Sequence, residues 1–396
     1  MNVLVTDGEN RSALAVTRSL GRHGCNVWVT GKERDTLASA SRYCYRACSV
    51  PDPLKKSATY AQAIIEIAAR EEISVIFPMT EQSVHSLNRV RSKLGKVVLA
   101  CAPQDRMDAV SDKLRLVQLA TQLQIPVPST VFISGMTDFV SQRKFIGPYP
   151  VVVKPTFSKI ADGDQMLSAG VMYAANLAEL DYLYHTRKVL QHPSLIQELI
   201  SGEGTGLFTL FDRGKHRALF AHRRLLEKPP SGGVSVLSES IRPDHGMVEA
   251  AGKLLAEVGW SGIAMVEFKR DNRDGTAKLM EINGRFWGSL QLAIASGVNF
   301  PVLSLGYHLG QPAPPDSDYL IGHRLKWQFG ILDHLLIRLK KGKQSALLPE
   351  RLPPLKQVIG ELFFTGGSTT SSDVYDRHDL KPLLREATCY LRNLAG

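Results

Sequence analysis

The sequence predicts an α/β and α+β protein, in which an open, mostly parallel α/β domain precedes a region dominated by antiparallel strands. Over roughly the first 105 residues, apolar runs of strand length alternate with amphipathic segments of helix length. From the segment "YPVVVKP" (149–155) onward, strand-like runs dominate and two pairs of them read as hairpins. The 396 residues, of which 44% are apolar, are enough for two or three domains with buried cores.

The first domain is predicted from a β-α-β start. Residues 2–6 (NVLVT) read as a strand, the next segment as a helix with Leu14, Val16 and Leu20 among its apolar positions, and "CNVWVTG" as a second strand. A dinucleotide-binding domain is a rival, but residues 6–13 read TDGENRSA and contain no G-x-G-x-x-G. The alternation continues in this order: helix 60–70, strand "ISVIFPM", helix "EQSVHSLNRVRSKLG" and strand "KVVLAC".

The elements after residue 105 are predicted from caps and turns. Ser111 or Asp112 caps a helix that runs to about Gln124, where "IPVP" stops it. One hairpin turns at "DRGK" (212–215), a helix covers about 244–258, and a second hairpin covers "SGIAMVEFKRDNRDGTAKLMEING". From about residue 311 the chain reads as a linker, an amphipathic basic segment, a loop at "FFTGGSTTSSD" and a terminal helix, without a chemical interpretation.

Net charge, the length of apolar runs and the cysteine spacing indicate the kind of partner and compartment to expect. The net charge of +10 favours an anionic partner, which nucleotides, polyanions and membrane headgroups all satisfy. No apolar run is long enough to span a bilayer, and the N-terminus lacks signal-peptide features. The five cysteines lack paired metal-ligand spacing and suggest free thiols in a reducing compartment, so we expect a cytoplasmic protein.

The stretch "KLMEINGRFWGS" (278–289) carries the clearest chemical signal. In an extended segment Glu281, Asn283 and Arg285 share one face. If the hairpin turn is centred on Asp274, Glu267 stands opposite Glu281, with Cβ atoms about 4.5–5.5 Å apart. Like charges so placed repel, and the remedy is a shared proton, an Arg or Lys between them, or a bound cation.

Two carboxylates and an amide oxygen are ligands suited to Mg²⁺, and the fork of Arg285 suits phosphate or carboxylate oxygens. Such a site implies a nucleotide held nearby. Lys154 ends the strand "YPVVVKP" and can meet a phosphate. The segment "LIQELISGEG" offers further contacts: Gln197, the backbone of Leu199 and Ile200 for an adenine edge, Glu198 for its amino group and Glu203 for a ribose hydroxyl.

The order of these residues resembles the ATP-grasp superfamily. It runs from Lys113 on a helix and Lys154 in "VVVKP", through the hinge "IQELISGEG", to Glu267 and "EINGR" (281–285). The segments "AHRRLLEKPPSGGVSVLSES" and "RFWGSLQLAIASGVNFP" further resemble carboxylate–amine ligase-like members, relatives of the carbamoyl-phosphate synthase large chain and D-alanine–D-alanine ligase. One departure is "TFSKIADGDQM", which has a single glycine where many members have a glycine-rich phosphate loop.

The resemblance implies a domain order. Residues 1–105 form a pre-ATP-grasp α/β domain, 106–200 the small lobe with the nucleotide-binding lysines and the hinge, 201–310 the large lobe with the Mg²⁺ site, and 311–396 a C-terminal extension of unknown role. It also implies an ADP-forming ligase. A carboxylate attacks the γ-phosphorus of ATP to give an acyl phosphate, and an amine then displaces phosphate.

The resemblance also implies roles for individual residues. Lys113 and Lys154 contact the ATP phosphates, and Glu267, Glu281 and Asn283 hold one or two Mg²⁺ ions, for which Mn²⁺ can substitute. Arg285 orients the carboxylate or the transferring phosphoryl group. Three further candidates stay open. Arg223 or Arg224 can help at the γ-phosphate, but because adjacent residues of a strand face opposite sides, at most one of them points into the cleft. Lys228 with Gly232 and Gly233 forms either a substrate-covering loop or an ordinary connection, and Arg11 is either an acceptor-binding or a structural residue.

Two other classes of function remain open. One is an ATP-binding regulatory or scaffold protein without turnover. The other is a polyanion- or membrane-surface-binding module that uses the basic C-terminal region around "RLKKGK" (338–343). For the ligase, the expected partners are a small-molecule carboxylate and an amine, with a homodimer possible. No nucleic acid is expected, because aromatic and basic residues do not interleave.

Overall fold

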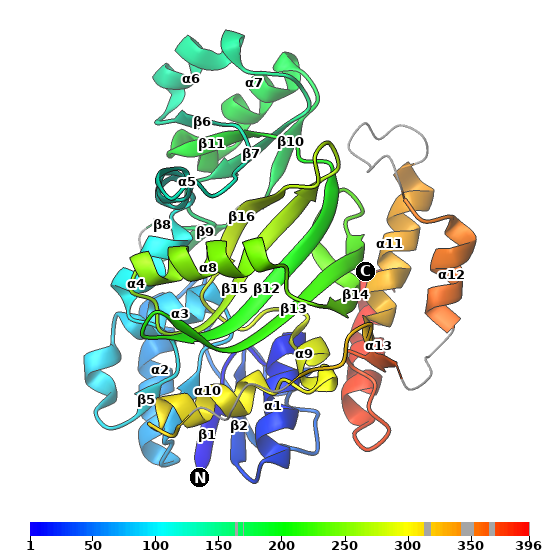
Figure 1. Cartoon of the computed structure of the whole chain (residues 1–396). Coiled ribbons are helices and arrows are strands. Elements are labelled where there is room, and N and C mark those ends of the chain that lie inside the picture. Colours follow the sequence, from blue (N-terminus) through cyan, green and yellow to red (C-terminus); the bar gives the residue numbers. More distant parts are fainter. Residues whose placement is uncertain (163–164, 169, 313–317, 342–351, 364–368, 396) are drawn as a thin grey trace.

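The N-terminal residues form a parallel sheet of strand order β3-β2-β1-β4-β5, flanked by helices (Figure 1). The computed structural model describes residues 1–162, 165–168, 170–312, 318–341, 352–363 and 369–395. The predicted parallel α/β domain is confirmed, but β3 was not predicted, because its sequence CYRACS has no alternating apolar pattern. The elements are β1 (Asn2–Val5), α1 (Arg11–Arg22), β2 (Asn26–Gly31), β3 (Cys44–Ser49), α2 (Ser57–Arg70), β4 (Val75–Phe77), α3 (Glu81–Asn88), the 3₁₀ helix η1 (Arg91–Leu94) and β5 (Val98–Leu99).

A second, smaller sheet has the order β10-β7-β11-β6 and lies at the top of Figure 1. The helix that leads to it is capped by Asp112, whose side chain accepts a hydrogen bond from the amide of Arg115, so Asp112 rather than Ser111 is the cap. The elements are α4 (Gln104–Ser111), α5 (Lys113–Gln122), β6 (Thr130–Ile133), α6 (Met136–Gln142), η2 (Arg143–Phe145), β7 (Val151–Pro155), the hairpin β8 (Lys159–Asp162) and β9 (Gln165–Ser168), β10 (Met172–Ala174), α7 (Leu177–Thr186), η3 (Lys188–Gln191) and β11 (Ser194–Glu198).

The largest sheet has the order β16-β15-β12-β13-β14-β17-β18 and contains both predicted hairpins. One expectation was wrong: part of "FFTGGSTTSSD" is the strand β18, which pairs in parallel with β17. Its residues are short and polar, so the sequence gives no strand signal. The elements are β12 (Gly202–Asp212), β13 (Lys215–Lys228), β14 (Val234–Ile241), α8 (His245–Glu257), β15 (Gly262–Asp271), β16 (Ala277–Asn283), α9 (Leu290–Ser296), α10 (Phe300–His308), β17 (Arg324–Lys326), α11 (Gln328–Lys341), α12 (Leu355–Phe363), β18 (Thr370–Ser372) and α13 (Lys381–Ala395).

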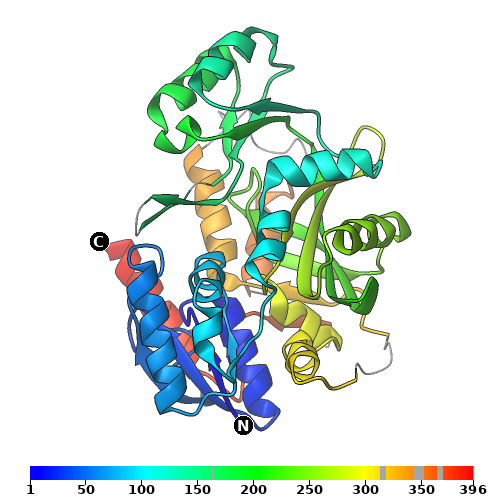
Figure 2. The ribbon, with the colours of Figure 1, turned by 90° about the vertical axis from the view of Figure 1, so that its left-hand side faces the viewer.

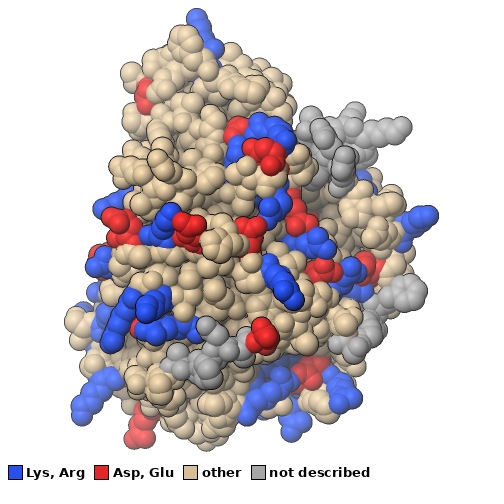
Figure 3. All heavy atoms as spheres, viewed as in Figure 1, with Lys and Arg blue, Asp and Glu red and all other residues tan. Residues whose placement is uncertain are grey.

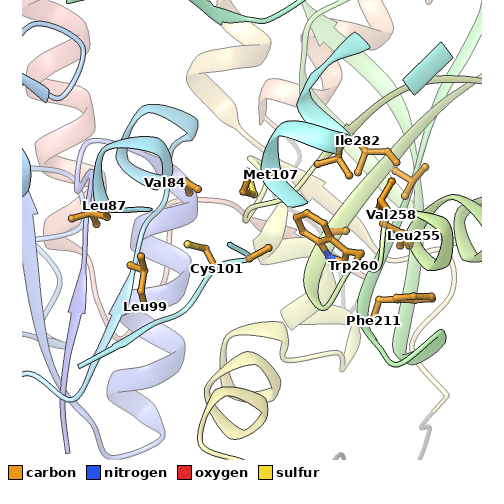
Figure 4. Packing of buried hydrophobic residues seen from close by; sticks show 14 of the residues in the cluster. Val84, Leu87, Leu99, Cys101, Met107, Phe211, Leu255, Val258, Trp260 and Ile282 are labelled. Atoms are coloured by element: carbon orange, nitrogen blue, oxygen red, sulfur yellow. The ribbon is translucent and has the colours of Figure 1, made fainter. Parts of the chain in front are cut away.

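Buried apolar side chains join the N-terminal domain to the large sheet. Figure 4 shows Leu87 and Leu99 of the N-terminal domain, Met107 of α4, Trp260, and Ile282 of β16 in the large sheet, all within one packed cluster. The smaller sheet has a separate core, formed by buried residues between positions 133 and 196. The N-terminal domain and the large sheet therefore share a core, whereas the small lobe packs around its own.

The C-terminal helix α13 lies against the N-terminal domain (Figure 2). Arginines of α1 bind aspartates of the C-terminal segment, most deeply Arg18, whose Nε donates to Asp379 at 2.9 Å. Among the described residues no single helix is long and apolar enough to cross a membrane; α9 and α10 satisfy length and composition only as a pair bent by 95°.

Candidate active site

Glu267 of β15 and Glu281 of β16 are paired across the hairpin, as predicted. The turn does not have the predicted centre, because Phe268 pairs with Leu279, one position out of step with the glutamate pair. A β-bulge at Met280 restores the register and places Met280 and Glu281 on the same cavity wall. The predicted pairing of the two glutamates is therefore correct. The centre of the turn, predicted at Asp274, lies half a residue earlier, between residues 273 and 274.

Arg224 of β13 relieves the repulsion between the two carboxylates. Its Nη2 donates to Glu267 Oε2 at 2.6 Å and its Nη1 to Glu227 Oε1 at 3.0 Å. Burial and the facing Glu281 raise the pKa of Glu267 in spite of the guanidinium. Of the remedies that the sequence left open, the structure contains a paired arginine, so charge balance alone does not require a cation.

Glu281 stays ionised more readily than Glu267. Burial opposes its charge, but Lys113, the hydrogen bond from Asn283, Lys154 and Arg285 together lower the pKa of Glu281. Asn283 Nδ2 donates to Glu281 Oε1 at 2.8 Å, and Arg285 Nη2 lies 3.3 Å from Asn283 Oδ1. The acidic pair therefore has one member held by Arg224 and one surrounded by cations.

Both carboxylates face a cavity of about 600 Å³ where the N-terminal domain, the small lobe and the large sheet meet. This is within the usual size of a small-molecule site. Lys154 at the end of β7 lies on its wall with 9% of its surface exposed. Burial, aided by Lys113, lowers the pKa of Lys154 against the opposing effects of Glu281 and Glu267. A buried ammonium next to a cavity is suited to an anionic ligand.

The predicted hinge residues Gln197, Glu198, Leu199 and Ile200 all line this cavity. The Glu198 carboxylate, predicted to take the adenine amino group, already accepts hydrogen bonds from Lys278 and from Arg273, each at 2.8 Å. The backbone of Leu199 lies between β11 and β12 and has no hydrogen-bond partner among the described residues. The Leu199 backbone is therefore available to a ligand, whereas the Ile200 carbonyl accepts a hydrogen bond from Lys269 Nζ at 3.1 Å and the Glu198 carboxylate is occupied.

Of the paired arginines, Arg224 faces the cavity and Arg223 does not. Arg223 donates to Glu239 at 2.7 Å and lies 3.6 Å from Glu203, which is also outside the cavity wall and so not placed for the predicted ribose contact. Lys228 likewise points away and pairs with Asp333 of α11. These placements separate Arg223, Glu203 and Lys228 from the residues that the cavity brings together.

Lys113 lies beside the main cavity, in a smaller one that also contains Glu281, Asn283 and Arg285. Its Nζ donates to Ser158 Oγ at 2.7 Å. The loop between β13 and β14 contributes Gly232 and Gly233 to the main cavity wall. The single glycine of "TFSKIADGDQM", Gly163, lies outside the described residues.

Two features of the site were not recognised in the sequence. Ser289 lines the cavity, and its Oγ lies 2.7 Å from Nε2 of the buried His222. Burial and the neighbouring Arg224 lower the pKa of His222 to about 3, so its imidazole is neutral and holds the serine in place. Glu227 also lines the cavity. Irregular pairing after Arg224 puts both residues on one face, contrary to strict alternation. A lone histidine and a bulge leave no sequence signal.

The molecular surface bears on the polyanion-binding alternative. On the face in Figure 3, lysine and arginine are interspersed with aspartate and glutamate, and no broad basic patch is formed. Within the basic run, Arg338 of α11 donates to the carbonyl of Pro353 at 2.7 Å, and residues 342–343 lie outside the described part of the chain.

Comparisons with known proteins identify a similar family and similar folds. Residues 192–327 match a family model described as "ATP-grasp in the biosynthetic pathway with Ter operon". A search of curated proteins found no significant match. This matched segment contains Glu267, Glu281, Asn283 and the Arg224 strand.

Solved structures share the fold over most of the chain. An N5-carboxyaminoimidazole synthetase from Staphylococcus aureus has a TM-score of 0.64 at 13% identity and covers 91% of this chain and 96% of its own. A biotin carboxylase from Campylobacter jejuni, in complex with a β,γ-ATP compound, has a TM-score of 0.64 at 17% identity, over 82% of this chain and 74% of its own. An L-amino acid ligase from Bacillus licheniformis has a TM-score of 0.59 at 17% identity, over 78% and 74%. At these identities the likeness concerns the fold.

Proposed function

We propose that this chain, an ATP-grasp protein by its fold and its family match, is a ligase that uses ATP to activate a carboxylate and joins it to an amine. The observation that carries the proposal is the assembly of Glu267, Glu281, Asn283 and Arg285 with Lys154 around one cavity. These residues come from different lobes, and a structural ion-pair network would have no need of an open cavity of about 600 Å³ between them.

The nucleotide is held between the small lobe and the large sheet. Lys154 provides a positive charge for the phosphates from a position that is almost fully buried, where water screens it little. Lys113 adds a second charge from beside the cavity. The backbone at Leu199 and Ile200, on the cavity wall, meets the adenine edge, and Val152 and Met280 provide apolar surface beside it.

The acidic pair fits a magnesium site. Glu267 and Glu281 each keep one carboxylate oxygen without a hydrogen-bond partner among the described residues, and Asn283 adds an amide oxygen. Such hard oxygen ligands suit Mg²⁺, with Mn²⁺ expected to substitute. When bound, the ion would neutralise charge on the phosphate oxygens. Among the described residues no group of three His, Cys, Asp or Glu side chains could hold a metal ion alone, so phosphate oxygens or water must complete the shell.

The two reaction steps need positioning and charge neutralisation from this chain. In the first, an oxygen of the carboxylate attacks the γ-phosphorus and the bond to ADP breaks. Arg285 lies on the cavity wall beside Asn283 and orients the carboxylate or the phosphoryl group. In the second, the amine attacks the acyl carbon, phosphate leaves, and the amine proton passes to solvent or phosphate. The loop with Gly232 and Gly233 limits water access to the acyl phosphate.

The test is an ADP-release screen with Mg-ATP over pooled amino acids, sugar acids and amino sugars, with mass detection of the amide product. Glu281→Gln and Asn283→Ala should each lower ADP formation by about 10²- to 10³-fold while the fold is kept. Glu239→Gln is the matched control, because this carboxylate of the same sheet pairs with arginines outside the cavity. Tight Mg-ATP binding without ADP release for any carboxylate would instead indicate the regulatory alternative.

A further inference from the structure

Arg11 lies at the edge of the same cavity but belongs to the N-terminal domain. It is the first residue of α1, which follows β1, so it lies at the carboxyl edge of the parallel sheet, where open α/β sheets bind ligands. Arg11 lines the cavity together with Asn10 and Ser12, and 13% of its side chain is exposed. The cavity therefore extends from the nucleotide region to a cationic group of the N-terminal domain.

The C-terminal segment fixes the Arg11 guanidinium. Arg11 Nη1 donates a hydrogen bond to the buried Asp373. The Arg11 guanidinium also stacks on Trp327, 3.8 Å from its ring centroid. The indole Nε1 of Trp327 donates in turn to Glu386 of α13 at 2.7 Å. An arginine held on both sides in this way loses little conformational freedom when it binds a ligand.

One edge of this guanidinium is left open. Arg11 Nη2 has no hydrogen-bond partner among the described residues, and a side chain at Gly288 would begin 3.6 Å from it. Because Gly288 has no side chain, the guanidinium is uncovered on the cavity wall. The neighbouring arginines differ: Arg18 and Arg22 bind aspartates of the same C-terminal segment but line no part of this cavity.

The start of α1 adds to the positive potential. Asn10 makes no side-chain cap, and the first turn of this 12-residue helix contains no acidic residue. The free amides and the helix dipole therefore favour a negative charge next to Arg11.

From these observations we infer that Arg11 binds an anionic group of the substrate, a carboxylate or a phosphate, separate from the carboxylate that is activated. The preferred substrate then carries a second negative charge. The inference rests on the proposed function only in taking the substrate carboxylate to enter this cavity. It also gives the C-terminal segment a role: Asp373 and Trp327 position the residue that recognises the substrate.

The variants are chosen so that misfolding cannot imitate the effect. Arg11→Gln alone leaves the buried Asp373 without its partner, so the main variant is the double change Arg11→Gln with Asp373→Asn. Arg11→Lys keeps the charge but removes the planar fork. Arg22→Gln is the matched control, because Arg22 lies on the same helix and also binds an aspartate of the C-terminal segment, away from the cavity.

The probes are matched pairs: glutarate against glutaramate, and 3-phosphoglycerate against glycerate, titrated by calorimetry and tested for ADP release. In the unmodified protein and in Arg22→Gln, the member with the second negative charge should bind about tenfold or more tightly than its singly charged partner in at least one pair. The double variant should lose that preference, and Arg11→Lys should lose part of it. A preference within the first pair identifies a carboxylate, and one within the second a phosphate.

Equal affinities within both pairs, including no binding at all, would overturn the inference, as would an unchanged preference in the double variant. Failure of the proposed ligase function is distinguishable, because it would abolish ADP release with every carboxylate and leave the calorimetric preference intact.

Discussion

Replacing Arg224 by methionine should be far more damaging than the same replacement at Arg223, although the two residues are adjacent in β13. Arg224 is 11% exposed and makes hydrogen bonds to Glu267 at 2.6 Å, to Glu227 at 3.0 Å and to the carbonyl of Gly233 at 3.2 Å. Methionine conserves most of the side-chain volume, so the change tests the charge and its hydrogen bonds rather than a cavity.

The magnitude follows from the burial of the partners. Arg224→Met leaves Glu267 and Glu227, each only 16% exposed, without their cation, and breaking a largely buried pair costs about 3–5 kcal/mol of the free energy of unfolding. Arg223 is 40% exposed, and its partner Glu239 keeps a second arginine, Arg324, at 2.7 Å. Arg223→Met should therefore cost about 1 kcal/mol or less.

Thermal unfolding and ADP formation are the assays. Arg224→Met should lower Tm by roughly 6 °C or more and ADP formation by about 10²-fold, since Glu267 loses its orienting partner. Arg223→Met should change both only slightly. Adding Glu267→Gln to Arg224→Met should restore part of the lost stability, because the unpaired charge is removed. Equal losses in the two single variants, or an unchanged Tm in Arg224→Met, would refute the reasoning.

Three further predictions follow from the site and its surroundings. Burial raises the pKa of Glu386 to about 7 in the folded protein, so its contribution to stability is full below about pH 4.5 and is lost as pH rises through 7. Glu386→Gln, which keeps an acceptor for Trp327, should therefore raise the free energy of unfolding, measured by urea denaturation, at pH 8 but not at pH 4.5, by at most about 3 kcal/mol. Lys154→Met should weaken ATP binding about tenfold or more in calorimetry without lowering Tm, because it removes a buried charge. Mg²⁺ alone should bind more weakly than Mg²⁺ with ATP in the same experiment, since Arg224 already balances Glu267.

Much of the scaffold could be predicted because it depends on local patterns. Apolar runs and turn residues in sequence order are sufficient for the β-α-β start and for both hairpins. The strand-end position of Lys154 and the facing of Glu267 and Glu281 are consequences of those same local elements. These parts of the site lie within one strand or one hairpin, where spacing in sequence translates directly into position.

The missed parts depend on irregular pairing or on long-range contacts. Alternation alone cannot tell that Arg224 and Glu227 face the same side, since the register of β13 against β14 shifts between them. The Arg11–Asp373 pair joins residues 362 positions apart. No periodicity in either segment indicates the other. Such pairs are decided by how whole domains dock, which a single sequence does not encode in its local pattern.

The position of Arg224 also changes the argument for a metal. In the sequence, the repulsion expected between two facing carboxylates in apolar strands was one reason to predict a bound Mg²⁺. In the folded chain Arg224 neutralises Glu267, and Lys113 and Lys154 lie near enough to Glu281 to lower its pKa. The pair is thus balanced before any ligand enters. What favours a metal is no longer the repulsion. It is that both carboxylates line a cavity with cationic walls and each keeps one oxygen without a hydrogen-bond partner among the described residues. Such a site has little net charge to attract a bare cation and is better suited to a cation that arrives with phosphates.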